Sequence, residues 1–260
     1  MANLFSLEGK VVLVTGASRG IGKSVAQQLV AQGAKVAGTA TSEGGAEKIS
    51  AYLGDKGKGY KLNVTDADSI TETLAAIKAD MGDVDVLVNN AGITRDNLLM
   101  RMKDDEWQDI IDTNLSSIFR LSKAVLRPMM KKKSGRIINI GSIHGLVASP
   151  FKSAYVAAKH GLLGFSKVLA LETSDVDITV NTICPAYVKT PLVEKQIADQ
   201  ATQHGISEEE VINKIMLEPM PKKSFIDIEE IAATVAFLAS PEARNMTGQA
   251  LVLDGGWTVK

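Results

Sequence analysis

Cysteine is scarce in this 260-residue sequence, which contains only Cys184. One cysteine cannot form an internal disulfide or a multi-cysteine metal site, so we expect neither and no bound metal. Charge of one sign is not in excess either, because 29 Lys and Arg face 30 Asp and Glu. This balance argues against nucleic acid or an anionic membrane as a partner. No apolar run reaches the roughly 20 residues of a membrane span, and residues 1–10 hold no signal-peptide stretch, so we expect a cytoplasmic protein.

Short β-branched runs alternate with longer helical patterns along the whole chain. Several of the runs are apolar almost throughout, as is typical of strands covered on both faces. The alternation predicts an α/β fold, namely a single doubly wound Rossmann domain over residues 1–260 with a seven-stranded parallel sheet. The predicted strands are residues 11–15, 35–39, 59–63, 84–89, 136–140, 178–184 and 250–253.

Helix boundaries are also marked in the sequence. Gly33 is expected to end the first helix, and either Thr65 or Asp66 is expected to cap the start of a later one. An apolar stripe predicts one long helix from about Asp104 to Met130. Two further helices open with capping-box spacing, at Ser207 with Glu210 and at Asp227 with Glu230.

A proline-rich segment interrupts this rhythm near the C-terminus. Four of the seven prolines lie between Cys184 and Lys222. Such a segment is either a mobile substrate lid or an ordered excursion of the chain. We favour a helical lid over about residues 186–222, because long loops in compact domains are usually functional.

A glycine-rich turn follows the first predicted strand, with the spacing Gly16-x-x-x-Gly20-x-Gly22, and a helix follows directly. Glycines there let the backbone approach a pyrophosphate, and the N–H groups at the start of the helix attract its negative charge. The turn therefore predicts a dinucleotide site.

Three further motifs make the prediction more specific. Asn89-Asn90-Ala91-Gly92 closes the fourth strand, Ser142 follows the fifth, and Tyr155-x-x-x-Lys159 opens the next helix. With the glycine turn, these motifs resemble the short-chain dehydrogenase/reductase family over essentially the full length. The resemblance implies a catalytic tetrad of Asn114, Ser142, Tyr155 and Lys159.

The chemistry of these residue types agrees with that role. A hydride moving to or from a carbonyl carbon requires a proton to move at the oxygen. Tyrosine is a poor base at its ordinary pKa of about 10, so it needs a nearby cation, and Lys159 lies one helical turn from Tyr155. Ser142 is expected to hydrogen-bond the carbonyl oxygen, and Asn114 to hold a water that links the lysine to solvent.

The resemblance also implies a set of cofactor residues. They are Gly16, Ser18, Arg19, Gly20, Ile21, Gly22, Thr41, Asn63, Val64, Asn90, Ala91, Gly92, Tyr155, Lys159, Pro185, Val188 and Thr190. Residues 39–42 lack the carboxylate that would hold the ribose of NAD(H), and Arg19 could meet a 2′-phosphate. We therefore expect NADP(H) to be preferred over NAD(H), the alternative being that Glu43 turns back to the ribose.

The two halves of the chain resemble different subfamilies of this family. Residues 1 to about 142, above all 38–42 and 91–102, resemble bacterial 3-oxoacyl-(acyl carrier protein) reductase. Residues from about 143 to 260 resemble bacterial (R)-3-hydroxybutyrate dehydrogenase, which suggests a hybrid or chimeric chain. The substrate residues implied are Thr94, Ser142, His144, Lys152, Tyr155, Tyr187, Gln196 and Trp257. Thr94 and Tyr187 depart from the glutamine and tryptophan usual in the dehydrogenases.

These resemblances favour an NADP(H)-dependent oxidoreductase that interconverts (R)-3-hydroxybutyrate and acetoacetate, as a homotetramer. The alternative is a 3-oxoacyl-(acyl carrier protein) reductase acting on thioesters. Acyl carrier protein is the less favoured partner, because Lys133 and Val176 stand where such reductases often have docking arginines. A nucleotide sensor without catalysis is a third possibility, against which the intact tetrad argues.

Overall fold

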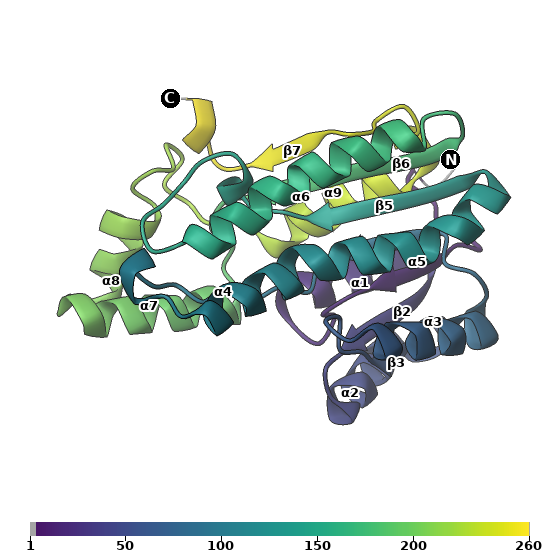
Figure 1. Cartoon of the computed structure of the whole chain (residues 1–260), viewed down its shortest axis with the longest axis horizontal. Helices are drawn as coiled ribbons and strands as arrows, with labels where there is room; N and C mark the ends of the chain where they lie inside the picture. Colours follow the sequence, from purple (N-terminus) through teal and green to yellow (C-terminus); the bar gives the residue numbers. More distant parts are fainter. Residues whose placement is uncertain (1–3, 260) are drawn as a thin grey trace.

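The computed structural model describes residues 4–259, apart from the side chains of residues 192 and 203. Within them one parallel sheet has the strand order β3-β2-β1-β4-β5-β6-β7 (Figure 1), so the predicted doubly wound fold is confirmed. The strands are β1 (Val11–Val14), β2 (Lys35–Ala40), β3 (Gly57–Lys61), β4 (Val86–Asn89), β5 (Ser134–Ile140), β6 (Asp177–Pro185) and β7 (Ala250–Leu253). The third strand begins two residues earlier than predicted, because Gly57 already pairs with Val36 of β2.

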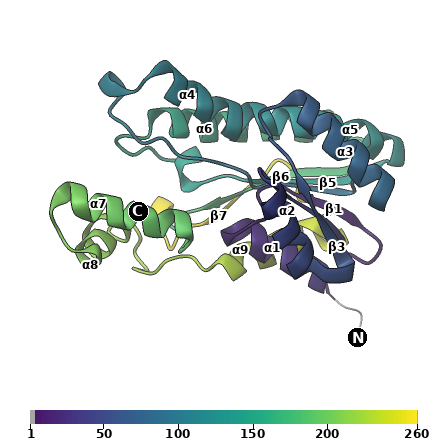
Figure 2. The ribbon, with the colours of Figure 1, turned by 90° about the horizontal axis from the view of Figure 1, so that it is seen from below.

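Helices cover both faces of the sheet, as seen from below in Figure 2. One layer contains α1 (Gly20–Ala31), α2 (Glu43–Leu53) and α9 (Ile228–Ala239), and the other contains α3 (Ala67–Met81), α5 (Ser117–Lys132) and α6 (Ser153–Glu172). Alternate residues of β1 face opposite layers: Val12 and Val14 pack with α1, and Val11 and Leu13 pack with α3 and α5. This two-sided burial explains why the strand is apolar throughout. None of the described helices is long and apolar enough to cross a membrane.

The predicted helix boundaries are largely confirmed. Asp66 caps α3, since its carboxylate accepts hydrogen bonds from the Asp68 and Ser69 N–H groups at 2.9 and 3.2 Å. The capping box of Ser207 and Glu210 is formed at the start of α8 (Glu208–Val211). Gly33 follows α1 with a φ of +94°, a backbone conformation that glycine adopts without strain.

The long helix predicted from Asp104 to Met130 is not uniform. It consists of α4 (Asp104–Ile111), a π-helical turn (Asp112–Ser116) and α5. The apolar stripe continues across the wider turn, so periodicity alone did not reveal it. The turn holds Asn114, which is fully buried, and π-turns of this kind are frequent at functional sites.

The proline-rich lid segment, residues 186–222, is helical. It contains α7 (Pro191–His204), α8 and a second π-helical turn (Ile212–Met216). These helices bury a small apolar core of their own, made by Val193, Ile197, Val211 and Met216. A short parallel bridge joins Val188 to Ile226. Opening of this lid segment stays a prediction.

A chain of buried polar side chains ties the centre of the sheet to α6. Asn89 of β4 donates to Asn139 of β5 at 2.8 Å, and Asn139 donates to the Ser166 hydroxyl of α6 at 2.9 Å. The Thr182 hydroxyl of β6 also donates to Ser166, at 3.0 Å. Buried polar groups are costly without partners, so Ser166 holds four elements in register.

Replacing this hydroxyl is expected to weaken the fold. Ser166→Ala leaves the Asn139 amide and the Thr182 hydroxyl without their partner, so the free energy of unfolding in urea should fall by about 1–3 kcal/mol. Ser122→Ala is the matched control, because within the described residues the buried Ser122 hydroxyl has no hydrogen-bond partner. An equal loss in both variants would contradict the role given to Ser166.

Candidate active site

The predicted site residues lie at or beyond the carboxyl ends of the strands. The arrows of β5 and β7 in Figure 1 point to the end of the molecule where α7 and α8 lie. The chain turns from β1 towards β2 on one side, whereas β4 pairs with β1 on the other. In open α/β sheets this switch point opens a crevice in which ligands bind.

The glycine turn after β1 is shaped by close backbone contacts. Gly16 and Gly20 have positive φ angles of 65° and 54°. A Cβ atom on Gly22 would lie 2.2 Å from the carbonyl oxygen of Gly16 and 2.5 Å from Nδ2 of Asn90. No larger residue fits at position 22 without moving the turn.

The start of α1 fits an external anion. Arg19 precedes the helix in an extended conformation, no described side chain caps it, and the first turn holds no acidic residue. By contrast, Ser42 and Asp66 cap α2 and α3. The free N–H groups and the helix dipole therefore suit a pyrophosphate, and Ser18, Arg19, Gly20 and Ile21 surround this end of the helix.

The loop after β4 is fastened directly to this turn. Asn90 Nδ2 donates to the carbonyl oxygens of Thr15 and Gly16 at 2.9 and 3.1 Å. In return, the Thr15 hydroxyl accepts from the N–H groups of Asn90 and Ala91 at 2.9 and 3.0 Å. The structure therefore brings Asn90, Ala91 and Gly92 against the turn. Thr15 was not among the predicted site residues.

The other residues expected to contact the cofactor lie at or just beyond the carboxyl ends of β2, β3 and β6. Thr41 is exposed after β2, and beyond β3 Asn63 is exposed whereas Val64 is buried. Glu43, in the first turn of α2, has Oε1 3.6 Å from Nζ of Lys61. Thr190 caps α7 and lies near the turn, because a Cβ on Gly20 would be 3.6 Å from its methyl group. Pro185 and Val188 are buried where β6 passes into the lid segment.

Tyr155, Lys159 and Ser142 meet where α6 faces the end of β5. Lys159 is buried and donates from Nζ to the carbonyl oxygen of Ile140 at 2.9 Å. The same Nζ lies 5.6 Å from the centre of the Tyr155 ring. The Ser142 hydroxyl accepts from the N–H of His144 at 3.2 Å, which leaves its own hydrogen free for another acceptor.

Burial shifts the pKa values of the two titratable groups in opposite directions. It raises the pKa of Tyr155 to about 12, an effect that the neighbouring Ser142 hydroxyl partly offsets. It lowers the pKa of Lys159 from 10.5 to about 8. At neutral pH the phenol is therefore protonated and the lysine charged, which suits proton donation to a carbonyl oxygen.

Asn114 contacts the loop after β4. Its side chain accepts from the N–H of Ile93 at 2.9 Å and donates to the carbonyl oxygen of the same residue at 2.8 Å. The amide is thus engaged with the backbone just beyond Gly92. A water held by Asn114 stays a prediction.

An aromatic wall closes one side of the site. His144 lies edge-on to Tyr155 and to Trp257, with ring centres 6.1 and 5.9 Å apart. Tyr187 stacks on Trp257 at 6.0 Å. Burial, together with the charge of Lys152, lowers the pKa of His144 to about 4. His144 is therefore neutral at physiological pH.

The other predicted substrate residues are paired with protein groups. Gln196 of the lid segment donates from Nε2 to the Thr94 hydroxyl at 3.4 Å. Lys152 forms an ion pair with Asp96, and its Nζ lies 5.7 Å from the centre of the Tyr155 ring. Asp96 was not predicted as a site residue from the sequence, because no motif links it to Lys152, which lies 56 positions further along the chain.

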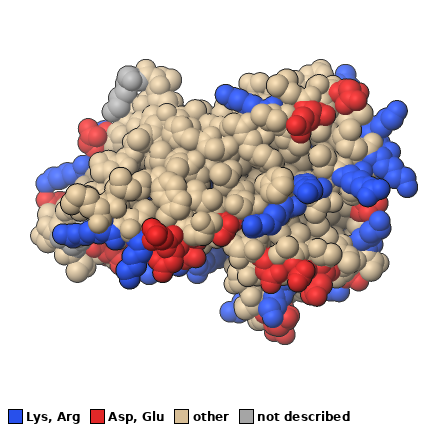
Figure 3. Space-filling model, in the orientation of Figure 1, with Lys and Arg blue, Asp and Glu red and all other residues tan. Residues whose placement is uncertain are grey.

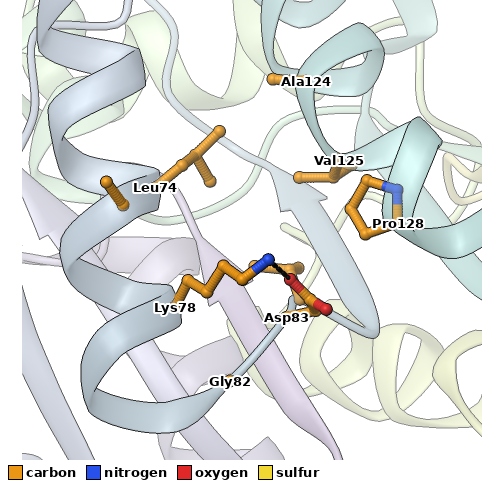
Figure 4. A pocket seen from close by; sticks show the side chains of 9 residues that line it. Leu74, Lys78, Gly82, Asp83, Ala124, Val125 and Pro128 are labelled. Carbon is orange, nitrogen blue, oxygen red and sulfur yellow. Dashed lines mark ion pairs between the residues drawn. The ribbon is translucent and has the colours of Figure 1, made fainter.

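A separate hollow lies at the opposite edge of the sheet, between α3 and α5. Figure 4 shows Leu74, Val125 and Pro128 around it, with an ion pair between Lys78 and Asp83 at its rim. It contains none of the predicted site residues, so we place the site at the carboxyl edge instead.

Comparison with known proteins gives consistent matches. Residues 10–201 match the family model described as short chain dehydrogenase. The chain is 56% identical to 3-oxoacyl-(acyl-carrier-protein) reductase FabG of Salmonella typhimurium over 251 aligned residues. This alignment covers 96% of this chain and 98% of that protein. It is 43% identical over 259 residues to D-beta-hydroxybutyrate dehydrogenase of Rhizobium meliloti, with 96% and 99% covered. A crystal structure of an actinorhodin polyketide ketoreductase variant with NADPH superimposes with a TM-score of 0.91, at 35% identity and 99% coverage of both chains.

Both curated relatives match across both halves of the chain. The comparisons therefore give no support to a hybrid divided near residue 142. They favour the expected alternative, a 3-oxoacyl reductase, over the hydroxybutyrate dehydrogenase.

The pKa of Lys159 predicts the pH dependence of the reaction. The pKa of Lys159 is lowered from 10.5 to about 8, so its ammonium group is charged at neutral pH. As the pH rises, the charge is lost around pH 8 instead of around pH 10.5. We expect kcat/KM for ketone reduction to fall as the pH rises through about 8. Lys159→Arg should remove this fall even if the rate is lower, because arginine keeps its charge. A profile that stays flat to about pH 10 would contradict the lowered pKa of Lys159, since the ammonium would then keep its proton over that range.

Proposed function

The chain belongs to the short-chain dehydrogenase family, and from this premise we propose that it reduces 3-oxoacyl thioesters to 3-hydroxyacyl thioesters with NADPH. The observation that carries the reaction type is the grouping of Tyr155, Lys159 and Ser142 at the carboxyl edge of the sheet, the same edge at which the start of α1 fits a pyrophosphate. The similarity to FabG supports the choice of thioester.

Each residue of this group has a distinct task. The Ser142 hydroxyl donates a hydrogen bond to the ketone oxygen, and the Tyr155 phenol transfers its proton to that oxygen. The Lys159 ammonium favours the phenolate that remains, and the carbonyl oxygen of Ile140 holds this ammonium in place. NADPH, when bound, supplies the hydride.

The charges around the site also agree with a neutral thioester. Of the groups expected to bind a free carboxylate, His144 is neutral and Lys152 is already paired with Asp96. A carboxylate without a partner in a closed site is costly. The thioester brings no charge to this position.

Oxidation of 3-hydroxybutyrate, or reduction of acetoacetate, is the second candidate. The observation that favours it is the wall of His144, Tyr187 and Trp257, which is suited to a small substrate. The similarity to D-beta-hydroxybutyrate dehydrogenase supports it as well. Both candidates share the same oxo group and the same proton donor.

We also infer a homo-oligomer, with a tetramer as the expected form. The outer faces of α5 and α6 expose apolar side chains, among them Phe119, Val168 and Leu171. In Figure 3 charged side chains lie around the periphery of the face, including its upper right, and the area over the first half of α6 is largely uncharged. Such a surface suits a second copy of the chain.

The decisive experiment compares two substrates in the same NADPH oxidation assay. We expect kcat/KM for an acetoacetyl thioester to exceed that for free acetoacetate by at least about tenfold, because only the free acid must place a carboxylate beside Asp96. Tyr155→Phe is the control, since it keeps the ring and removes the proton, and it should abolish turnover of both substrates. If acetoacetate is the better substrate, the second candidate replaces the first.

Arg19 provides the test of cofactor preference. It is exposed beside the start of α1, and residues 39–42 offer no carboxylate to a ribose. We expect NADPH to be preferred over NADH, and Arg19→Ala to narrow this preference mainly through KM, because the contact is equal in the ground and transition states. Equal or better kcat/KM with NADH in the unaltered protein would contradict the assignment.

A further inference from the structure

An acidic residue reaches the substrate side of the site from outside the family motifs. Asp96 lies in the loop between β4 and α4, and its carboxylate pairs with Lys152 just before α6. The Lys152 side chain is 12% exposed, so the pair is well shielded from solvent on the lysine side. Lys152 Nζ is also 5.7 Å from the Tyr155 ring centre. The pair therefore stands next to the proton donor.

Three basic side chains besides Lys152 have to be considered as partners of a substrate carboxylate. Lys159 is directed away from the pair, towards the carbonyl oxygen of Ile140. His144 is neutral, and the nearby Arg95 is directed to Asp109, at 3.5 Å. Asp96 also acts on the site electrostatically, since its charge raises the pKa values of both Tyr155 and Tyr187. Lys152 is thus the cation available to a substrate carboxylate, and Asp96 already occupies it.

We propose that Asp96 is a specificity-determining residue, which competes with the carboxylate of free 3-oxo acids for Lys152 and so favours substrates whose acyl end is uncharged. A free acid has to displace Asp96 or share Lys152 with it, and two carboxylates at one ammonium repel each other. A thioester meets neither cost. This inference deepens the proposed function and rests on it, because it names the feature that separates its two candidate substrates.

Asp96→Asn tests the proposal by removing the charge and keeping the shape of the side chain. Lys152 is then free to bind a substrate carboxylate, and a charged hydrogen bond of this kind corresponds to roughly a tenfold to hundredfold change. We expect the ratio of kcat/KM for acetoacetate to that for an acetoacetyl thioester to rise by this factor. Most of the change should appear in KM for acetoacetate, because the contact is made before the chemical step.

Two further variants assign the effect to the pair. In Asp96→Asn combined with Lys152→Ala the gain should disappear, because it acts through the lysine. Asp83→Asn is the matched control, since it removes the carboxylate from another lysine–aspartate ion pair, that of Asp83 with Lys78 at 3.0 Å beside the separate hollow. It should leave the ratio within about twofold. Thermal unfolding checks that each variant is folded, and Asp96→Ser is the second choice if the asparagine variant is not.

The outcomes separate this inference from the proposed function. An unchanged or lower ratio in Asp96→Asn overturns it, as does an equal rise in Asp83→Asn or a rise that persists without Lys152. Failure of the unaltered protein to reduce the thioester instead overturns the proposed function. In that case kcat/KM for acetoacetate alone, compared between Asp96→Asn and the unaltered protein, still tests whether Asp96 competes for Lys152.

Discussion

The hydrogen bonds between the loop after β4 and the turn after β1 are the contact on which the rest of the site depends. The segments that follow β1 and β4 separate at the switch point, and the side chain of Asn90 supplies the donor for the carbonyl oxygens of Thr15 and Gly16 there. The carbonyl oxygen of Gly16 and Nδ2 of Asn90 approach position 22 so closely that only glycine fits there. The start of α1, which no described side chain caps, is open to an anion. One amide thus connects the integrity of the sheet edge with the shape of the nucleotide crevice.

Burial shifts the pKa values of Tyr155 and Lys159, the pair that we propose to be catalytic, in opposite directions, and both shifts suit reduction at neutral pH. Low polarity around the phenol keeps the proton on Tyr155, and the same low polarity weakens the hold of Lys159 on its own proton. The carbonyl oxygen of Ile140 fixes the ammonium at the end of β5. Directly below, Asn139 and Ser166 join β5 to α6. The position of the lysine therefore depends on the register of a strand and a helix.

Much of this arrangement could be predicted from the sequence, because it is encoded locally. Strands that are buried on both faces are recognisable as apolar runs. Helix ends are recognisable from Asp66, whose side chain caps α3, and from Gly33, which adopts a positive φ angle. The π-helical turn around Asn114 could not be predicted, since the apolar stripe runs through it without a break. The partners of Asn139 and Asp96 were hidden for another reason. They lie 27 and 56 positions away, and only the packed fold brings them together.

The pairing of Asp96 with Lys152 shows that a sequence motif alone is not enough to predict substrate specificity. Taken with its own segment, Lys152 resembles the carboxylate-binding lysine of the hydroxybutyrate dehydrogenases. Asp96 belongs to residues 91–102, the part that resembles carrier-protein reductases. A cation binds a substrate carboxylate more weakly when a protein carboxylate already pairs with it. We therefore infer that the substrate preference depends on the pair and not on either residue alone.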